Sequence, residues 1–195
     1  MINKNSACEF SGSRDEVIGF ITTLFDVRGE SMYAGEPVSQ TEHALQAAVL
    51  AEQEDASSHL ISAALLHDIG HLLSAHDEDC ADAGIDDQHE RLGSQWLGRY
   101  FGSDVVEPIR LHVPAKRYLC AVDPSYLRDL SPASMLSLEL QGGPFGKAEI
   151  EAFELLPHAK DALRLRQWDE AAKIPDMKLP VLEHFHETLQ TCLLD

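Results

Sequence analysis

The stretch that decides the fold reads Ala63-Ala64-Leu65-Leu66-His67-Asp68-Ile69-Gly70-His71. Its apolar first half is typical of a buried helix, which ends at an adjacent histidine and aspartate before a glycine breaks it. Buried carboxylates and imidazoles are costly unless they are paired or bound to metal. The negative end of a helix favours a histidine but repels an acid. The pair His67-Asp68 therefore predicts a metal site.

Length and charge narrow the class of protein. A chain of 195 residues can bury a sizeable core, so we expect one domain over residues 1–195, with residues 1–12 as a loose N-terminal tail. A net charge of -18 argues against nucleic acid or an anionic membrane as the main partner, because both are polyanions. It leaves room for a small anionic substrate, because basic residues gather late in the chain.

The cysteines and the N-terminus indicate a reducing compartment. The four cysteines show no CxxC pairing, which favours free thiols over disulfides or a zinc knuckle. The first ten residues lack the apolar core of a signal peptide, and no apolar run approaches membrane-spanning length. We expect a cytoplasmic protein with no membrane partner, and the sequence predicts no particular oligomeric state.

Helical patterns follow one another along the chain, and no alternating strand run or internal repeat interrupts them. Ser39 and Glu42 form a capping-box pattern at one helix start. Pro114 is expected to end the helix that carries His112. The expected longer helices cover residues 14–29, 39–51, 57–68, 88–100, 104–112, 147–156, 158–173 and 181–193, and shorter ones begin at Asp123-Pro124 and Ser131-Pro132. The chain is predicted to be all-α.

Four histidines are each expected at the start or end of a separate helix: His43, His67, His89 and His112. A helical bundle brings ligands from several elements to one interior point in this way. His71 lies past the helix break and is expected beside the metal or facing a substrate. The other histidines are expected on the surface, namely His59, His76, His158, His184 and His186. Imidazoles and carboxylates without thiolates suit Fe, Mn, Zn or Co.

With Asp169 added, the set His43, His67-Asp68, His89, His112 and Asp169 resembles the HD-domain superfamily, an all-α family rich in metal-dependent phosphohydrolases. Further motifs carry a narrower resemblance: residues 33–36 (YAGE), 112–120 (HVPAKRYLC), 141–144 (QGGP) and 163–169 (LRLRQWD). Over about residues 31–173 the chain is similar to the PhnZ/TmpB-like oxygenases of phosphonate catabolism.

This resemblance implies an HD-domain helical bundle with a buried binuclear centre. The implied cofactor is a pair of iron ions, Fe(II)/Fe(III), with O₂ as co-substrate. Carried over by position, one iron is held by His43, His67 and Asp169, the other by His89 and His112, and Asp68 bridges the two.

The resemblance also implies a substrate site. Lys116 and Arg166 match positions that hold a phosphonate, and a point charge beside a forked donor suits that dianion. His71 and Ser134 match further substrate contacts.

Tyr33 and Glu36 match a mobile loop with two roles in the family. Tyr33 fills an iron position until substrate displaces it, and Glu36 meets the amine of the substrate. With His71, these two residues form the implied catalytic set.

The implied reaction cleaves the C–P bond of 1-hydroxy-2-aminoethylphosphonate, either unmethylated or N-methylated, such as (R)-1-hydroxy-2-(trimethylammonio)ethylphosphonate. Phosphate and either glycine or glycine betaine would be released. A metal-dependent phosphohydrolase acting on phosphate esters is the alternative, because two metals can also generate a hydroxide. Tyr33 and Glu36 argue against it, since hydrolysis needs no loop over an oxygen site. Inositol oxygenation needs no cation site like Glu36, and an inactive scaffold would not keep all six ligand positions.

Overall fold

The structure is a computed structural model, and it describes residues 10, 12–33, 35–74 and 86–195. Its helices are α1 (Arg14–Arg28), α2 (Gln40–Gln53), α3 (Ser58–Leu66), α4 (Ile69–Leu73), α5 (His89–Leu97), α6 (Ser103–Val122), α7 (Pro124–Asp129), α8 (Pro132–Leu140), α9 (Lys147–Glu154), α10 (Ala159–Ala171), the 3₁₀ helix η2 (Leu182–Phe185) and α11 (His186–Cys192). Within these ranges there is no strand, only two isolated bridges. The all-α prediction is confirmed. Most of the expected N-terminal tail, and His76, lie outside the described residues.

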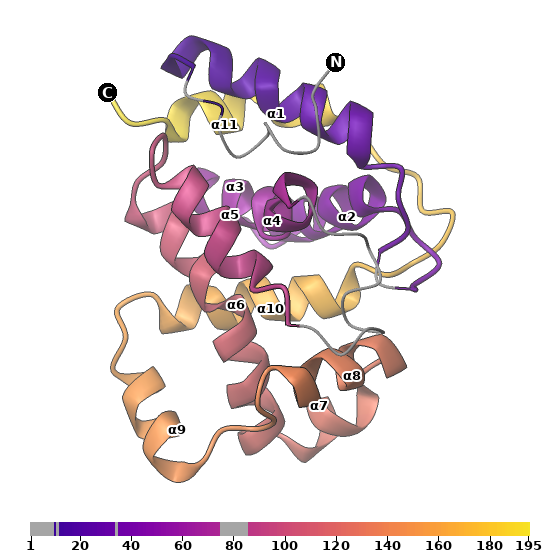
Figure 1. The fold of residues 1–195 in the computed structure, drawn as a ribbon, viewed down its shortest axis with the longest axis vertical. Coiled ribbons are helices and arrows are strands. Elements are labelled where there is room, and N and C mark those ends of the chain that lie inside the picture. Colours follow the sequence, from indigo (N-terminus) through magenta and orange to yellow (C-terminus); the bar gives the residue numbers. More distant parts are fainter. Residues whose placement is uncertain (1–9, 11, 34, 75–85) are drawn as a thin grey trace.

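The helices are arranged around a central layer. Figure 1 shows α1 and α11 together across one end of the molecule, α2 to α5 in the middle, and α7 to α9 at the other end. The long helix α6 runs from the middle to the far end and packs against α10, α5 and α3. The helices that carry the candidate ligands therefore meet near the centre.

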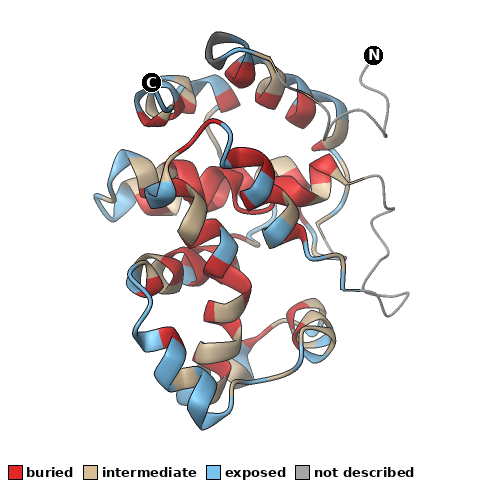
Figure 2. Cartoon of the chain, turned by 60° about the vertical axis from the view of Figure 1, so that its left-hand side comes forward, coloured by how far each residue is buried: buried red, intermediate tan, exposed pale blue. Residues whose placement is uncertain are grey.

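The main core lies in the same layer, where buried residues concentrate in Figure 2. Three alanines of α2, Ala47, Ala48 and Ala51, are fully buried, and their small side chains let α3 pack close to α2. Trp96 and Phe101 fill the space beside α5 and α6. The candidate site is thus embedded in a packed apolar interior.

Several expected helix starts are confirmed. At the start of α2, the Ser39 hydroxyl accepts the Glu42 backbone N–H at 3.1 Å, and the Glu42 carboxylate accepts the Ser39 N–H at 2.7 Å. Asp123 caps α7 and Ser131 caps α8, each followed by proline in the first turn. These local rules set where the helices begin.

Pro114 does not end its helix, so that prediction is wrong. α6 continues through Pro114 to Val122, and His112 lies in its interior. Proline removes one backbone hydrogen bond. On either side of it, Leu111 and Ala115 are buried in an apolar cluster with α9 and α10, and this packing outweighs the missing bond.

The break after the apolar run also differs from the expectation. α3 ends at Leu66, and Gly70 lies inside α4 rather than at the break. A Cβ atom at Gly70 would collide with the carbonyl oxygen of His89, so glycine is needed here for α5 to pack closely. At the other end of the chain, the expected helix 181–193 begins with the 3₁₀ turn η2 instead of an α-helical turn.

No helix of the described residues combines the length and apolar character that crossing a bilayer requires.

Candidate metal centre

Four imidazoles converge on the middle of the bundle, and each is held through its Nδ1 atom. The partner oxygens belong to Ala172 for His43 (2.8 Å), Ala64 for His67 (2.8 Å), Asp87 for His89 (2.9 Å) and Ile109 for His112 (2.7 Å). Carbonyl and carboxylate oxygens accept, so each Nδ1 carries the proton. A ring in its neutral form therefore presents a lone pair at Nε2, the atom a metal would bind.

These Nε2 atoms face one another in two pairs. His43 Nε2 lies 3.1 Å from His67 Nε2, and His89 Nε2 lies 3.1 Å from His112 Nε2. Two lone pairs at this distance repel unless a proton or a metal cation lies between them. A positive charge beside each of the two Nε2 pairs would therefore stabilise the arrangement.

Asp68 lies between the two pairs. Its Oδ2 is 3.3 Å from His67 Nε2 and 3.6 Å from His43 Nε2, while its Oδ1 is 3.3 Å from His89 Nε2 and 3.5 Å from His112 Nε2. Both oxygens are buried and neither accepts a hydrogen bond. An unsatisfied buried carboxylate is costly, and a cation on each side would remove that cost.

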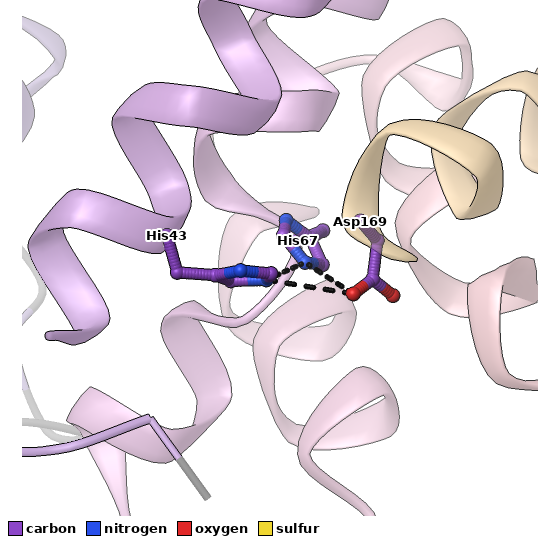
Figure 3. A group of neighbouring side chains, drawn as sticks. All are labelled: His43, His67 and Asp169. Atoms are coloured by element: carbon purple, nitrogen blue, oxygen red, sulfur yellow. Dashed lines mark hydrogen bonds and ion pairs between the residues drawn. The ribbon is translucent and has the colours of Figure 1, made fainter. Parts of the chain in front are cut away.

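Asp169 from α10 completes one side of the cluster, as Figure 3 shows. Its Oδ1 lies 3.5 Å from His43 Nε2 and 3.8 Å from His67 Nε2. The ligand atoms of these three residues lie within 4.8 Å of one another, and the same holds for Asp68, His71 and His89. The donor set fits metal ions with nitrogen and oxygen ligands.

Without a metal ion, the buried carboxylates and imidazoles of the cluster shift one another's pKa values. Burial would lower the pKa of His67, but Asp68 and Asp169 raise it to about 10. Burial acts the same way on His89, but Asp87 and Asp68 raise its pKa to about 9. The pKa of Asp68 stays well below its usual value, because the imidazoles around it outweigh burial.

Tyr33 lies at this centre. The Tyr33 hydroxyl donates to Asp169 Oδ1 at 3.3 Å, and its ring stacks on His43 with 3.7 Å between centroids. Burial and the charges of Asp169 and Asp68 raise the pKa of Tyr33 well above its usual value, so the hydroxyl keeps its proton.

Glu36 lies farther out on the same loop. One of its carboxylate oxygens is buried and accepts no hydrogen bond, and Lys173 Nζ lies 3.6 Å from that oxygen. The contact is an ion pair at long range, which leaves room for a second positive group.

Arg166 connects the cluster to the outer part of the site. It is buried, and its guanidinium donates through Nη1 to Asp169, through Nη2 to Glu170 and through Nε to Tyr126 Oη at 2.6 Å. The two carboxylates hold the pKa of Arg166 above its ordinary value despite burial. The forked donor thus orients Asp169 directly.

Lys116 and Ser134 lie close to Arg166. Lys116 is buried and donates to Ser137 Oγ at 2.8 Å, and Ser134 Oγ donates to Glu170 Oε2 at 3.0 Å. Burial and, to a smaller extent, the charge of Arg166 lower the pKa of Lys116 to about 7. An anionic ligand beside this buried ammonium would stabilise its charged form and raise its pKa again.

His71 lies on the other side of the cluster. Its Nδ1 is 2.7 Å from Asp87 Oδ2, and its ring stacks on His89 with 4.0 Å between centroids. Its side chain keeps 29% of its surface exposed, so it can meet a molecule that reaches the cluster from outside.

Residues 41–141, which carry His43, His67-Asp68, His89 and His112, match the family model described as HD domain. The chain belongs to the HD-domain family. Among curated proteins, this HD-domain chain is 49% identical to a hydroxymethylphosphonate dioxygenase of Gimesia maris, with 89% of this chain and 88% of that protein covered. It is 43% identical to a [1-hydroxy-2-(trimethylamino)ethyl]phosphonate dioxygenase (glycine-betaine-forming) of Leisingera caerulea, with 91% of each covered. An uncharacterised mimivirus protein is 32% identical over 95% of this chain.

Two of these relatives are named as phosphonate dioxygenases, the family that the sequence motifs resemble. The expected single domain over residues 1–195 stays a prediction, because the family match covers only part of that range.

The structure brings all six predicted ligands of this chain to one centre, five from the HD-domain match and Asp169 from α10, and it gathers Lys116, Ser134 and Arg166 beside it. Four further residues contact this set and were not predicted from the sequence: Asp87, Tyr126, Glu170 and Lys173. For Glu170 a signal existed, since it lies four residues after Arg166 on the same helix face. Tyr126 comes from α7, and nothing in the local sequence predicts its contact.

Proposed function

We propose that this HD-domain protein is a diiron enzyme that uses O₂ to cleave the C–P bond of a 1-hydroxyphosphonate. The observation that carries the proposal is the buried carboxylate of Asp68, which has no hydrogen bond and lies between two pairs of imidazole Nε2 atoms. Imidazole and carboxylate ligands without a thiolate suit iron. The names of two relatives support O₂ and a phosphonate as reactants.

In this proposal His43, His67 and Asp169 would hold one iron, His89 and His112 would hold the other, and Asp68 would be shared between them. When bound, the iron pair supplies the reaction of O₂ with the substrate carbon. The overall reaction consumes one O₂: the carbon next to phosphorus leaves as a carboxylate and the phosphorus leaves as phosphate.

The chain's own residues bind and orient the substrate. Lys116, Ser134 and Arg166 would hold the phosphonate, combining a point charge, a hydroxyl and a planar donor. His71 would contact the substrate from the opposite side. The Tyr33 hydroxyl, which donates a hydrogen bond to Asp169, would move away from the centre when substrate binds. Substrate binding would in this way open the centre to O₂.

Glu36 would determine which substituent on the reacting carbon the site accepts. Its buried, unsatisfied oxygen would suit the ammonium of 1-hydroxy-2-aminoethylphosphonate, and its charge would also attract a trimethylammonium group. One relative is named for the trimethylated substrate, and the other for hydroxymethylphosphonate, which has no amine. We propose the amine-bearing substrates on the strength of the Glu36 oxygen.

The test is phosphate release by the iron-loaded, partly reduced protein, with and without O₂. The substrates are hydroxymethylphosphonate, 1-hydroxy-2-aminoethylphosphonate and its trimethyl form, and His67→Gln is the matched inactive control. Oxygen-dependent release from any of them supports the oxygenase, and the ratio among them identifies the substrate.

The opposite result is equally defined. If the phosphonates are not cleaved, but phosphate esters are hydrolysed without O₂, the protein is a metal-dependent phosphohydrolase and the proposal fails.

A further inference from the structure

Asp87, which lies two residues before the start of α5, contacts two histidines with one carboxylate. Its Oδ1 lies 2.9 Å from His89 Nδ1, and its Oδ2 lies 2.7 Å from His71 Nδ1. The two imidazoles stack with an interplanar angle of 24°. Each oxygen of the carboxylate therefore serves one ring.

The carboxylate of Asp87 determines which ring nitrogen of His71 and of His89 carries a proton. An ionised carboxylate only accepts hydrogen bonds, so both Nδ1 atoms must carry protons. The Nε2 atom of His89 is thereby left to face His112 and Asp68.

His89 differs in this respect from the other three imidazoles. The Nδ1 atoms of those three donate to backbone carbonyls. The Nδ1 atom of His89 instead donates to the carboxylate of Asp87, which also accepts from His71. A carboxylate behind a ligating imidazole strengthens it as a ligand and fixes its orientation.

We propose that Asp87 is a positioning residue that sets the tautomers of His89 and His71 together and so links the second metal position to the substrate contact. The proposal rests on the metal centre put forward above. It does not depend on which reaction that centre performs.

Asp87→Asn tests it sharply. The amide keeps one acceptor oxygen but replaces the other by an NH₂ donor, so it can accept from only one of the two Nδ1–H groups. The other imidazole must turn or move its proton to Nε2. We expect the affinity for the second metal ion to fall about tenfold to hundredfold, measured by equilibrium dialysis with Mn²⁺ and Zn²⁺.

Asp86→Asn is the matched control, because Asp86 is exposed, carries the same charge and, among the described residues, accepts a hydrogen bond from the backbone N–H of Gln88 rather than from a histidine. It should bind both metals as the unaltered protein does. Equal binding by Asp87→Asn and the unaltered protein would overturn the proposal.

A second measurement needs no variant that could misfold. In the Zn²⁺-loaded protein, ¹⁵N chemical shifts of the histidine rings should show protonated Nδ1 in both His71 and His89. An Nε2–H tautomer in either ring would overturn the proposal. If instead both metals bind, the tautomers are as expected and no phosphonate is cleaved, the proposed function fails while the role of Asp87 stands.

Discussion

Lys116 makes substrate binding depend on pH in a way that can be calculated. The pKa of about 7, in place of 10.5, means that the site as a whole, chiefly through burial, disfavours the ammonium form by roughly 5 kcal/mol in the free protein. The charged form is present below pH 7 and is lost above it. A dianionic phosphonate restores the charged form in the complex, because the two opposite charges attract.

Loss of the Lys116 charge at alkaline pH should lower kcat/KM but not kcat. The ratio kcat/KM reports the free enzyme, so it should fall about tenfold per pH unit above pH 7, to about a hundredth between pH 7.5 and 9.5. The value of kcat reports the complex and should stay level over that range. Phosphate release at saturating O₂ measures both.

Two substitutions separate Lys116 from other titrating groups, including the substrate itself. Lys116→Arg keeps its charge at every pH used, so the alkaline fall should disappear. Lys116→Met should match the unaltered protein at pH 9.5 and fall below it at pH 7. An alkaline fall that survives unchanged in Lys116→Arg would refute the reasoning, provided that metal content is equal in all three proteins.

Three further perturbations address the metal centre and the loop. Asp68→Asn should reduce bound metal from two ions to at most one per chain, measured by elemental analysis, with the exposed Asp129→Asn as control; two ions in both would remove the bridging role. Metal binding at pH 7 should release about two protons, because the pKa values of His67 and His89 are about 10 and 9 in the protonated cluster, so affinity falls as pH is lowered. Titration calorimetry in buffers of different ionisation enthalpy counts these protons, and a count of zero contradicts the cluster's charge state. Glu36→Gln should lower kcat/KM about tenfold to hundredfold for the amine-bearing substrate and leave hydroxymethylphosphonate unaffected; equal losses would exclude an amine contact.

The ligand residues could be predicted from sequence because each combines an unusual residue type with a helical context. The pair His67-Asp68 follows an apolar run whose residues are almost fully buried, so its polarity needed an explanation at once. The capping box at Ser39 likewise placed His43 in the first turn of α2. Local chemistry decided both features.

The continuation of α6 through Pro114 could not be predicted in the same way. The local rule states what proline costs, but the compensation comes from α9 and α10, whose buried residues lie more than thirty positions later. Gly70 is a similar case, because the reason for a glycine is the carbonyl of His89 on another helix. Tertiary contacts outweighed the local signal at both positions.

The side of the site that meets the substrate depends on one face of α10. Arg166, Asp169 and Glu170 lie there at spacings of three and four, and Lys173 follows two residues after the helix ends. Arg166 contacts both carboxylates, and Lys173 contacts Glu170 at 2.8 Å and Ser134 at 2.9 Å. The metal ligand Asp169 is therefore part of a continuous charge network.

Tyr33 and Glu36, from the loop before α2, each contact this network. Tyr33 donates to Asp169, and Glu36 pairs with Lys173 at 3.6 Å. Moving the loop away breaks both contacts at once, while the contacts within α10 stay intact. A substrate that brings an anion to Arg166 competes for the cation that holds Asp169 and Glu170, and a substrate ammonium competes with Lys173 for Glu36. One molecule carrying both charges would therefore weaken both loop contacts together, whereas a phosphonate without an amine would act on the network through its anion alone.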